Sequence, residues 1–146
     1  MDLKDFYLNT EMTRPKYMLV PRKMIPQDII DEYNLKHLFR NDMILSKIVK
    51  GMYGLPQAGR LAYKKLKRHL ATAVYIPTEN TPGLCTHVTN DIKFILVVKN
   101  FGVKFANLNH AQHLLNHLRS IYTVTTNWEG KFFAASALTG TTRNKP

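Results

Sequence analysis

Residues 57–74 have apolar side chains at the spacing of an amphipathic helix, and this pattern constrains the fold more than any other feature of the sequence. The apolar positions are Leu61, Ala62, Leu66, Leu70 and Val74. All the lysines of the segment and Arg68 lie between them, and Arg60 directly precedes Leu61. A helix with this pattern buries its apolar face and keeps its charged face in solvent. The segment therefore predicts a long basic helix that packs on another apolar layer.

The rest of the chain divides into further helices and extended segments. Residues 109–121 repeat the helical pattern, with Asn109 as N-cap and an inner stripe of Ala111, Leu115, Leu118 and Tyr122. A short helix over 27–33 follows Pro26, which suits a first helical position. Extended segments are predicted over 16–20, 43–49, 84–88, 93–98, 122–126 and 131–135, with turns over 80–83 and 89–91. The apolar run 95–98 favours a buried strand. Helices and hairpins in this arrangement indicate an α+β fold, with a small antiparallel sheet backed by two helices.

The length of the chain predicts how many domains it has, and its charge predicts the class of partner. The 146 residues predict one domain over residues 1–138, followed by a disordered tail over residues 139–146. The net charge is +11, from 21 Lys and Arg against 10 Asp and Glu. Such an excess favours a polyanionic partner.

The positive charge is concentrated between residues 43 and 78, a stretch without any acid. Its cations are Lys47, Lys50, Arg60, Lys64, Lys65, Lys67 and Arg68. Nucleic acid suits this block better than a membrane, because no neighbouring run has the apolar length of an anchor. A basic helix face is also commonly no more than a solvated surface, so both interpretations stay open here.

Cysteine and histidine content limits the metal and redox chemistry. The single cysteine, Cys85, excludes an internal disulfide or a Cys-rich zinc module and is expected in the core. His110, His113 and His117 can share one helix face, but without a fourth ligand we expect a solvated side rather than a zinc site. The opening Met-Asp-Leu-Lys-Asp is not a signal peptide. We expect an intracellular protein of the cytoplasm or nucleus.

Three short runs follow one another in a recognisable order. They are Asp2-Leu3-Lys4-Asp5-Phe6-Tyr7-Leu8, then Lys50-Gly51-Met52-Tyr53-Gly54-Leu55-Pro56-Gln57-Ala58-Gly59, then the segment 94–105. In order and character they resemble the reverse transcriptases of copia-type LTR retrotransposons. The resemblance spans residues 2–138. It implies an incomplete palm of an RNA-directed DNA polymerase, with the fingers truncated and the thumb absent.

The resemblance also implies roles for individual residues. In the family, Mg²⁺ ions held by carboxylates drive phosphoryl transfer on a primer-template of RNA or DNA. Asp2 matches the first metal-binding aspartate, and the backbone of Leu3 lies beside the metal. Tyr7 matches the aromatic under the incoming sugar, and Gln57 matches a glutamine that reaches nucleotide and template. The basic residues Lys50, Arg60, Lys64, Lys65, Lys67 and Arg68 would then follow the nucleic acid.

The third run departs from the family at its metal-binding turn. Family members carry an Asp-Asp pair, whereas Lys99 and Asn100 stand at those two positions. We therefore expect no bound metal and no polymerase activity. We also expect the Lys99 ammonium to approach Asp2 in place of the lost cation. Two alternatives to an inactive polymerase remain, a binding module held by backbone charge and a retroelement relic without selected function, and the sequence leaves the oligomeric state open.

Overall fold

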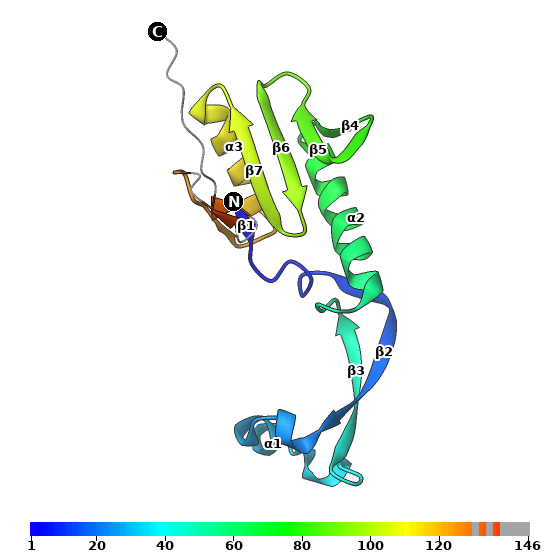
Figure 1. The fold of residues 1–146 in the computed structure, drawn as a ribbon. Helices are drawn as coiled ribbons and strands as arrows, with labels where there is room; N and C mark the ends of the chain where they lie inside the picture. Colours follow the sequence, from blue (N-terminus) through cyan, green and yellow to red (C-terminus); the bar gives the residue numbers. More distant parts are fainter. Residues whose placement is uncertain (130–131, 134–135, 138–146) are drawn as a thin grey trace.

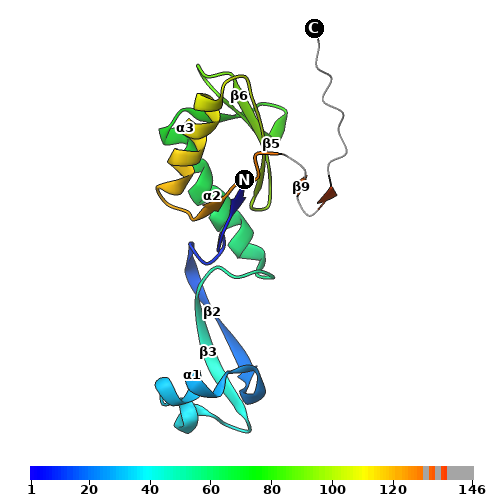
Figure 2. The same cartoon turned by 90° about the vertical axis from the view of Figure 1, so that its left-hand side faces the viewer.

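The computed structural model describes residues 1–129, 132–133 and 136–137. Its main body is a six-stranded antiparallel sheet with strand order β4-β5-β6-β7-β1-β8. These strands are β1 (Asp2–Leu3), β4 (Tyr75–Thr78), β5 (Thr81–His87), β6 (Ile92–Val97), β7 (Asn100–Phe105) and β8 (Val124–Thr125). Helices α2 (Pro56–Thr72) and α3 (Leu108–Arg119) lie together on one face (Figures 1 and 2). The α+β class and the two backing helices are confirmed.

A long two-stranded ribbon projects from this body (Figure 1). It pairs β2 (Glu11–Pro21) with β3 (Met43–Lys50), and an irregularity interrupts the register between Glu11 and Lys16. The short elements η1 (Arg22–Met24), α1 (Gln27–Glu32) and η2 (Leu35–Leu38) form its far end. The sequence predicted both strands and α1, but not their separation from the sheet. The predicted first helical residue, Pro26, is the N-cap of α1 instead.

The core lies between the sheet and the two helices. Helix α2 contributes Ala62, Leu66 and Leu70, and α3 contributes Leu114, Leu115 and Leu118. From the sheet, Leu3, Ile92, Phe94 and Phe101 pack against them. Each helix buries residues three or four positions apart, as the apolar periodicity predicts. Among the described residues, no helix combines the length and apolar character needed to span a bilayer.

Three boundary predictions are wrong. Val74 was expected on the buried stripe of the first helix, but α2 ends at Thr72 and Val74 is 48% exposed with a φ of 52°. The turn predicted over 80–83 is tighter, because β4 and β5 continue to Thr78 and from Thr81. The N-cap of α3 is Asn107, whose side-chain oxygen accepts the Asn109 backbone N–H.

The strand buried on both faces is also a wrong prediction. Ile95, Val97 and Val98 are each 39% exposed or more, whereas Ile92 and Phe94 are buried. The reason is that helices cover only one face of the sheet, so alternate residues of β6 face outward (Figure 2). Of the segment 131–135, the structure describes β9 (Phe132–Phe133), which pairs with β10 (Ser136–Ala137). The predicted tail over 139–146 lies outside the described residues.

Candidate functional site

Strand β1 brings the three positions of the resembled metal site together. Within the sheet, β1 lies between β7 and β8, and Asp2 is directly opposite Asn100 on one side and Thr125 on the other. A two-residue turn, Val98 and Lys99, joins β6 to β7. The Leu3 backbone N–H donates to the Lys99 carbonyl oxygen at 3.0 Å, and the Leu3 side chain is fully buried. The end of β1 is therefore fixed against the β6–β7 turn.

The Lys99 side chain points to Asp2, as expected from the sequence. Lys99 Nζ donates to Asp2 Oδ2 at 3.2 Å, although the two residues are 97 positions apart in the chain. The side chains are 45% and 32% exposed, respectively. Asp2 Oδ1 is buried and has no hydrogen-bond partner in the described part of the chain. One carboxylate oxygen thus accepts a hydrogen bond from an ammonium, and the other accepts none within the described part of the chain.

These residues do not fit the Mg²⁺ pair that the resemblance implies. Mg²⁺ requires near-octahedral oxygen ligands and usually carboxylates, whereas the only acid among the three positions is Asp2. Asn100 offers a neutral amide, and the Lys99 ammonium already contacts the carboxylate. Nor do residues 1–129 and the described part beyond them contain a cluster of three metal-ligating side chains. We therefore derive no chemistry through a metal at this position.

The first two sequence runs pack on each other beside this site. A side chain at Gly51 would place its Cβ 2.8 Å from the Tyr7 carbonyl oxygen, so only glycine fits there. The Gly51 N–H donates to the Thr10 carbonyl oxygen at 2.8 Å. The Tyr7 ring meets Tyr53 edge-on at 6.1 Å between centroids. Gln57 follows in the first turn of α2 and is half-buried.

The basic residues of α2 divide into two groups. Arg60, Lys64, Lys67 and Arg68 are exposed and follow one stripe of the helix, opposite its buried alanines and leucines. Lys65 is different, because its Nζ donates to the Asn9 carbonyl oxygen and lies 5.9 Å from the centre of the Tyr122 ring. Lys50 is exposed at the end of β3. Lys65 therefore ties α2 to the loop after β1 rather than facing solvent with the others.

Histidines connect elements that are distant in the sequence, which the sequence pattern did not predict. The rings of His69 on α2 and His117 on α3 stack at 4.0 Å with an interplanar angle of 6°. Each ring donates from Nε2 to the backbone carbonyl oxygen of the other residue at 2.7 Å. His113 contacts Tyr75 through a 2.9 Å bond from the tyrosine hydroxyl to Nδ1. His113 and His117 lie on the outer part of α3, and they also contact Tyr75 on β4 and His69 on α2.

His87, on β5, is the buried member of this group. Its Nδ1 accepts the backbone N–H groups of Thr89 and Asn90 at 3.1 and 3.0 Å. Burial lowers the pKa of His87, and the positive charges of His113 and His110 lower it further. Burial alone raises the pKa of Tyr75 to about 12. Burial therefore favours the neutral forms of His87 and Tyr75 where they pack between sheet and helix.

Three features of this region can take part in function. The Asp2 carboxylate is paired with the Lys99 ammonium, and Gly51 packs against the backbone of Tyr7. Helix α2 presents one exposed stripe of cations. Of the residues singled out from the sequence, the structure brings Asp2, Lys99 and Asn100 into contact range. It removes Lys65 from the cationic stripe. No protein-family model, curated protein or solved structure matches this chain.

Proposed function

We propose that this chain is a reverse-transcriptase-derived palm domain that does not polymerise DNA and that binds the backbone of nucleic acid through α2. The observation that carries the proposal is the 3.2 Å contact between Lys99 Nζ and Asp2 Oδ2. It lies where the resembled family places three carboxylates around metal ions. With an ammonium in this position, the chain has lost the electrostatic arrangement that phosphoryl transfer requires.

Binding is supported by the stripe of Arg60, Lys64, Lys67 and Arg68. The stripe extends about 12 Å along the helix axis, at ~1.5 Å per residue. The helix itself contains no acid that would neutralise these cations. Several cations on one face neutralise neighbouring phosphates and release counterions, without reading the sequence of the nucleic acid. The partner is therefore RNA or DNA held through its backbone.

Primer extension tests the catalytic half of the proposal. We expect no nucleotide incorporation on an RNA or DNA template with Mg²⁺ or Mn²⁺, because Asp2 is the only carboxylate among the three positions. An active reverse transcriptase run in the same buffers controls the substrates. Extension by this chain that disappears in Asp2→Asn would overturn the proposal of an inactive palm.

Salt-dependent binding tests the second half. We expect the triple variant Arg60→Gln, Lys64→Gln, Lys67→Gln to bind a single-stranded RNA more weakly. The slope of the logarithm of the binding constant against the logarithm of the salt concentration should become shallower by about 2, at roughly 0.7 for each phosphate that is no longer neutralised. The matched control is Arg14→Gln, Lys104→Gln and Arg119→Gln, which removes the same charge from exposed positions elsewhere. Equal weakening by both triples would mean that only net charge matters. No binding by the unaltered chain would favour a relic without function.

A further inference from the structure

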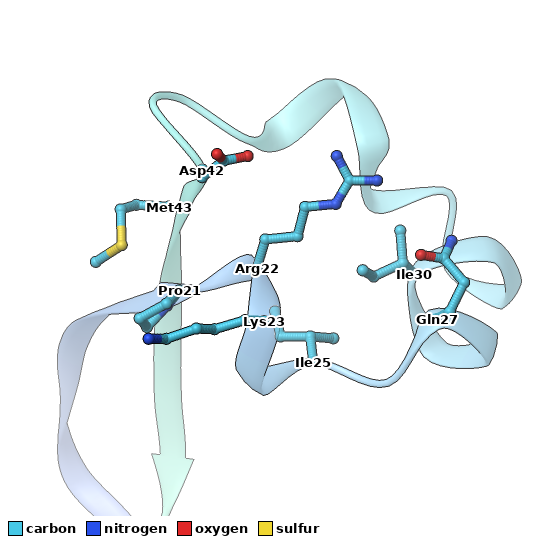
Figure 3. A pocket seen from close by; sticks show the side chains of 8 residues that line it. All are labelled: Pro21, Arg22, Lys23, Ile25, Gln27, Ile30, Asp42 and Met43. Carbon is cyan, nitrogen blue, oxygen red and sulfur yellow. The ribbon is translucent and has the colours of Figure 1, made fainter.

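The far end of the ribbon contains a pocket that the nucleic-acid proposal does not use. It has a volume of about 560 Å³, within the range of small-molecule sites (Figure 3). It lies where β2 ends and β3 begins, with α1 on its other side. Ile25, Ile30 and Met43 are apolar members of its lining; Ile25 and Met43 are half-buried, whereas Ile30 is only 1% exposed and supports the wall from behind. The pocket therefore offers an apolar surface to a ligand.

Backbone contacts hold the walls of this pocket in place. Pro21 and Met43 are directly opposite each other in the last pair of the ribbon. The Arg22 N–H donates to the Asp42 carbonyl oxygen at 2.8 Å. Asn41 and Asp42 both have positive φ, and Arg40 and Met43 exchange backbone hydrogen bonds across them, as in a tight hairpin turn. Backbone hydrogen bonds thus join the two sides of the pocket in the absence of a ligand.

Two adjacent cations, Arg22 and Lys23, line the pocket together with one acid, Asp42. Neither cation forms an ion pair within the described part of the chain. The Arg22 guanidinium lies 5.6 Å from the centre of the Phe39 ring, which orients it without occupying its N–H groups. In Figure 3 this guanidinium points across the space between Asp42 and Ile30. Its free N–H fork matches a carboxylate or phosphate.

We propose that this pocket binds a small organic anion that has an apolar body. The body would pack on Ile25 and the methylene groups of Gln27, in front of the buried Ile30, while the anionic group would accept hydrogen bonds from Arg22. A bare phosphate would leave the apolar lining in water, and a neutral apolar molecule would leave the guanidinium N–H groups without an acceptor. The combination of both surfaces selects amphiphilic anions, whether the anionic group is a carboxylate or a phosphate.

Amide chemical shifts of the full chain test the proposal with 8-anilinonaphthalene-1-sulfonate as the probe. We expect saturable shifts in the amides between residues 21 and 30, the two prolines excepted, and in residues 42–43. Arg22→Met should weaken this binding at least 10-fold, and Gln27→Trp, which fills the pocket from its rim, should do the same. Arg14→Met, at an exposed arginine on β2, is the matched control and should leave the affinity unchanged. Melting curves establish that each variant is folded.

Competition then identifies the anionic group. Octanoate and adenosine monophosphate should each displace the probe, and the stronger competitor tells carboxylate from phosphate, whereas octanol and adenosine should displace it at least 10-fold less well. The proposal is overturned if the shifts of the unaltered chain lie outside residues 21–30 and 42–43. It is equally overturned if folded Arg22→Met binds the probe as the unaltered chain does. Neither result depends on whether the chain binds nucleic acid.

Discussion

At the scale of single residues, Asp2 and Lys99 form the most informative contact. The pair is partly exposed, so its net contribution is modest, and its importance lies in the counter-charge it gives to a half-buried carboxylate. The sequence anticipated this contact because the resemblance aligns Asp2 with a metal-binding acid and Lys99 with another, and an acid without a metal there needs a cation nearby. It could not anticipate that Asp2 Oδ1 would be left without a partner in the described part of the chain.

We predict that Lys99→Met lowers the free energy of unfolding by about 1 kcal/mol, the upper part of the range for such pairs. Urea denaturation measures the change, and Lys104→Met, an exposed lysine on the neighbouring strand, should change it by less than about 0.5 kcal/mol. A double-mutant cycle with Asp2→Asn isolates the pair. A coupling energy of zero would show that the contact does not stabilise the fold.

Lys65 provides a second prediction at the residue scale. Lys65→Met should destabilise the fold by about 1–2 kcal/mol, because it removes a charged hydrogen bond to the Asn9 carbonyl oxygen and a contact with the Tyr122 ring. Lys67→Met, two residues away and exposed, should leave stability nearly unchanged. If both variants unfold at the same urea concentration as the unaltered chain, Lys65 is another surface cation and belongs with the stripe.

At the scale of elements, histidines link the two helices to each other and α3 to the sheet. The His69–His117 stack joins α2 to α3, and the His87–His113 contact, with ring centroids 5.4 Å apart, joins β5 to α3. The helical pattern around residues 57–74 and 109–121 predicted which faces are buried, but neither pattern predicted these partners. Contacts between residues 48 positions apart, such as His69 and His117, arise from how the helices pack.

The lowered pKa of His87 predicts a loss of stability on acidification. Burial lowers the pKa of this ring in the folded state, whereas the unfolded chain takes up the proton near the ordinary pKa of 6.5. The unfolded state therefore binds more protons as the pH falls below about 6.5, and the free energy of unfolding decreases over that interval. Comparing urea denaturation at pH 7.5 and pH 5.5 measures this decrease.

His87→Asn isolates this effect, because its side-chain oxygen can accept the Thr89 and Asn90 N–H groups without titrating. We expect its stability to depend less on pH than that of the unaltered chain. His37→Asn, at an exposed position on η2, serves as the control and should keep the original dependence. An unchanged dependence in His87→Asn would assign the acid sensitivity to other groups.

At the scale of the whole molecule, the structure has one well-packed body and one thin extension (Figure 1). The body combines the six-stranded sheet with α2 and α3, and its buried residues form one cluster. On the ribbon, Tyr17, Leu19 and Leu45 are 59% exposed or more. Two-stranded ribbons without a covering layer are marginally stable. The ribbon and the body should therefore differ in local stability.

Hydrogen exchange measures that difference. We predict that the hydrogen-bonded amides of residues 17–20 and 44–47 exchange at least 100-fold faster than those of β6 and β7, because the ribbon opens without unfolding the core. The amides at the centre of α2 should exchange as slowly as those of the sheet. Equal protection of ribbon and sheet would show that the whole chain unfolds as one unit.

The α+β class, the two helices with their buried faces, and the hairpin around residues 89–91 follow from the sequence alone. Periodicity is a local property, because a helix or strand repeats its apolar side chains at its own spacing whatever its partner is. Local information also identified Asp2, Lys99 and Asn100 as candidate site residues. It did so because the short motifs that contain them follow one another in the order of the resembled family. It also marked the cations of α2, although not which of them are free.

Tertiary packing accounts for the rest. Val74 leaves the core because α2 ends two residues earlier, and Ile95 and Val97 are exposed because helices cover one face of the sheet only. The Lys65 side chain is not part of the exposed cationic stripe, because it donates a hydrogen bond to Asn9 in the loop after β1. Each of these outcomes depends on which elements meet. Which elements meet depends on the shape and burial of surfaces that are distant in the sequence. A linear pattern of apolar and charged residues does not contain this information.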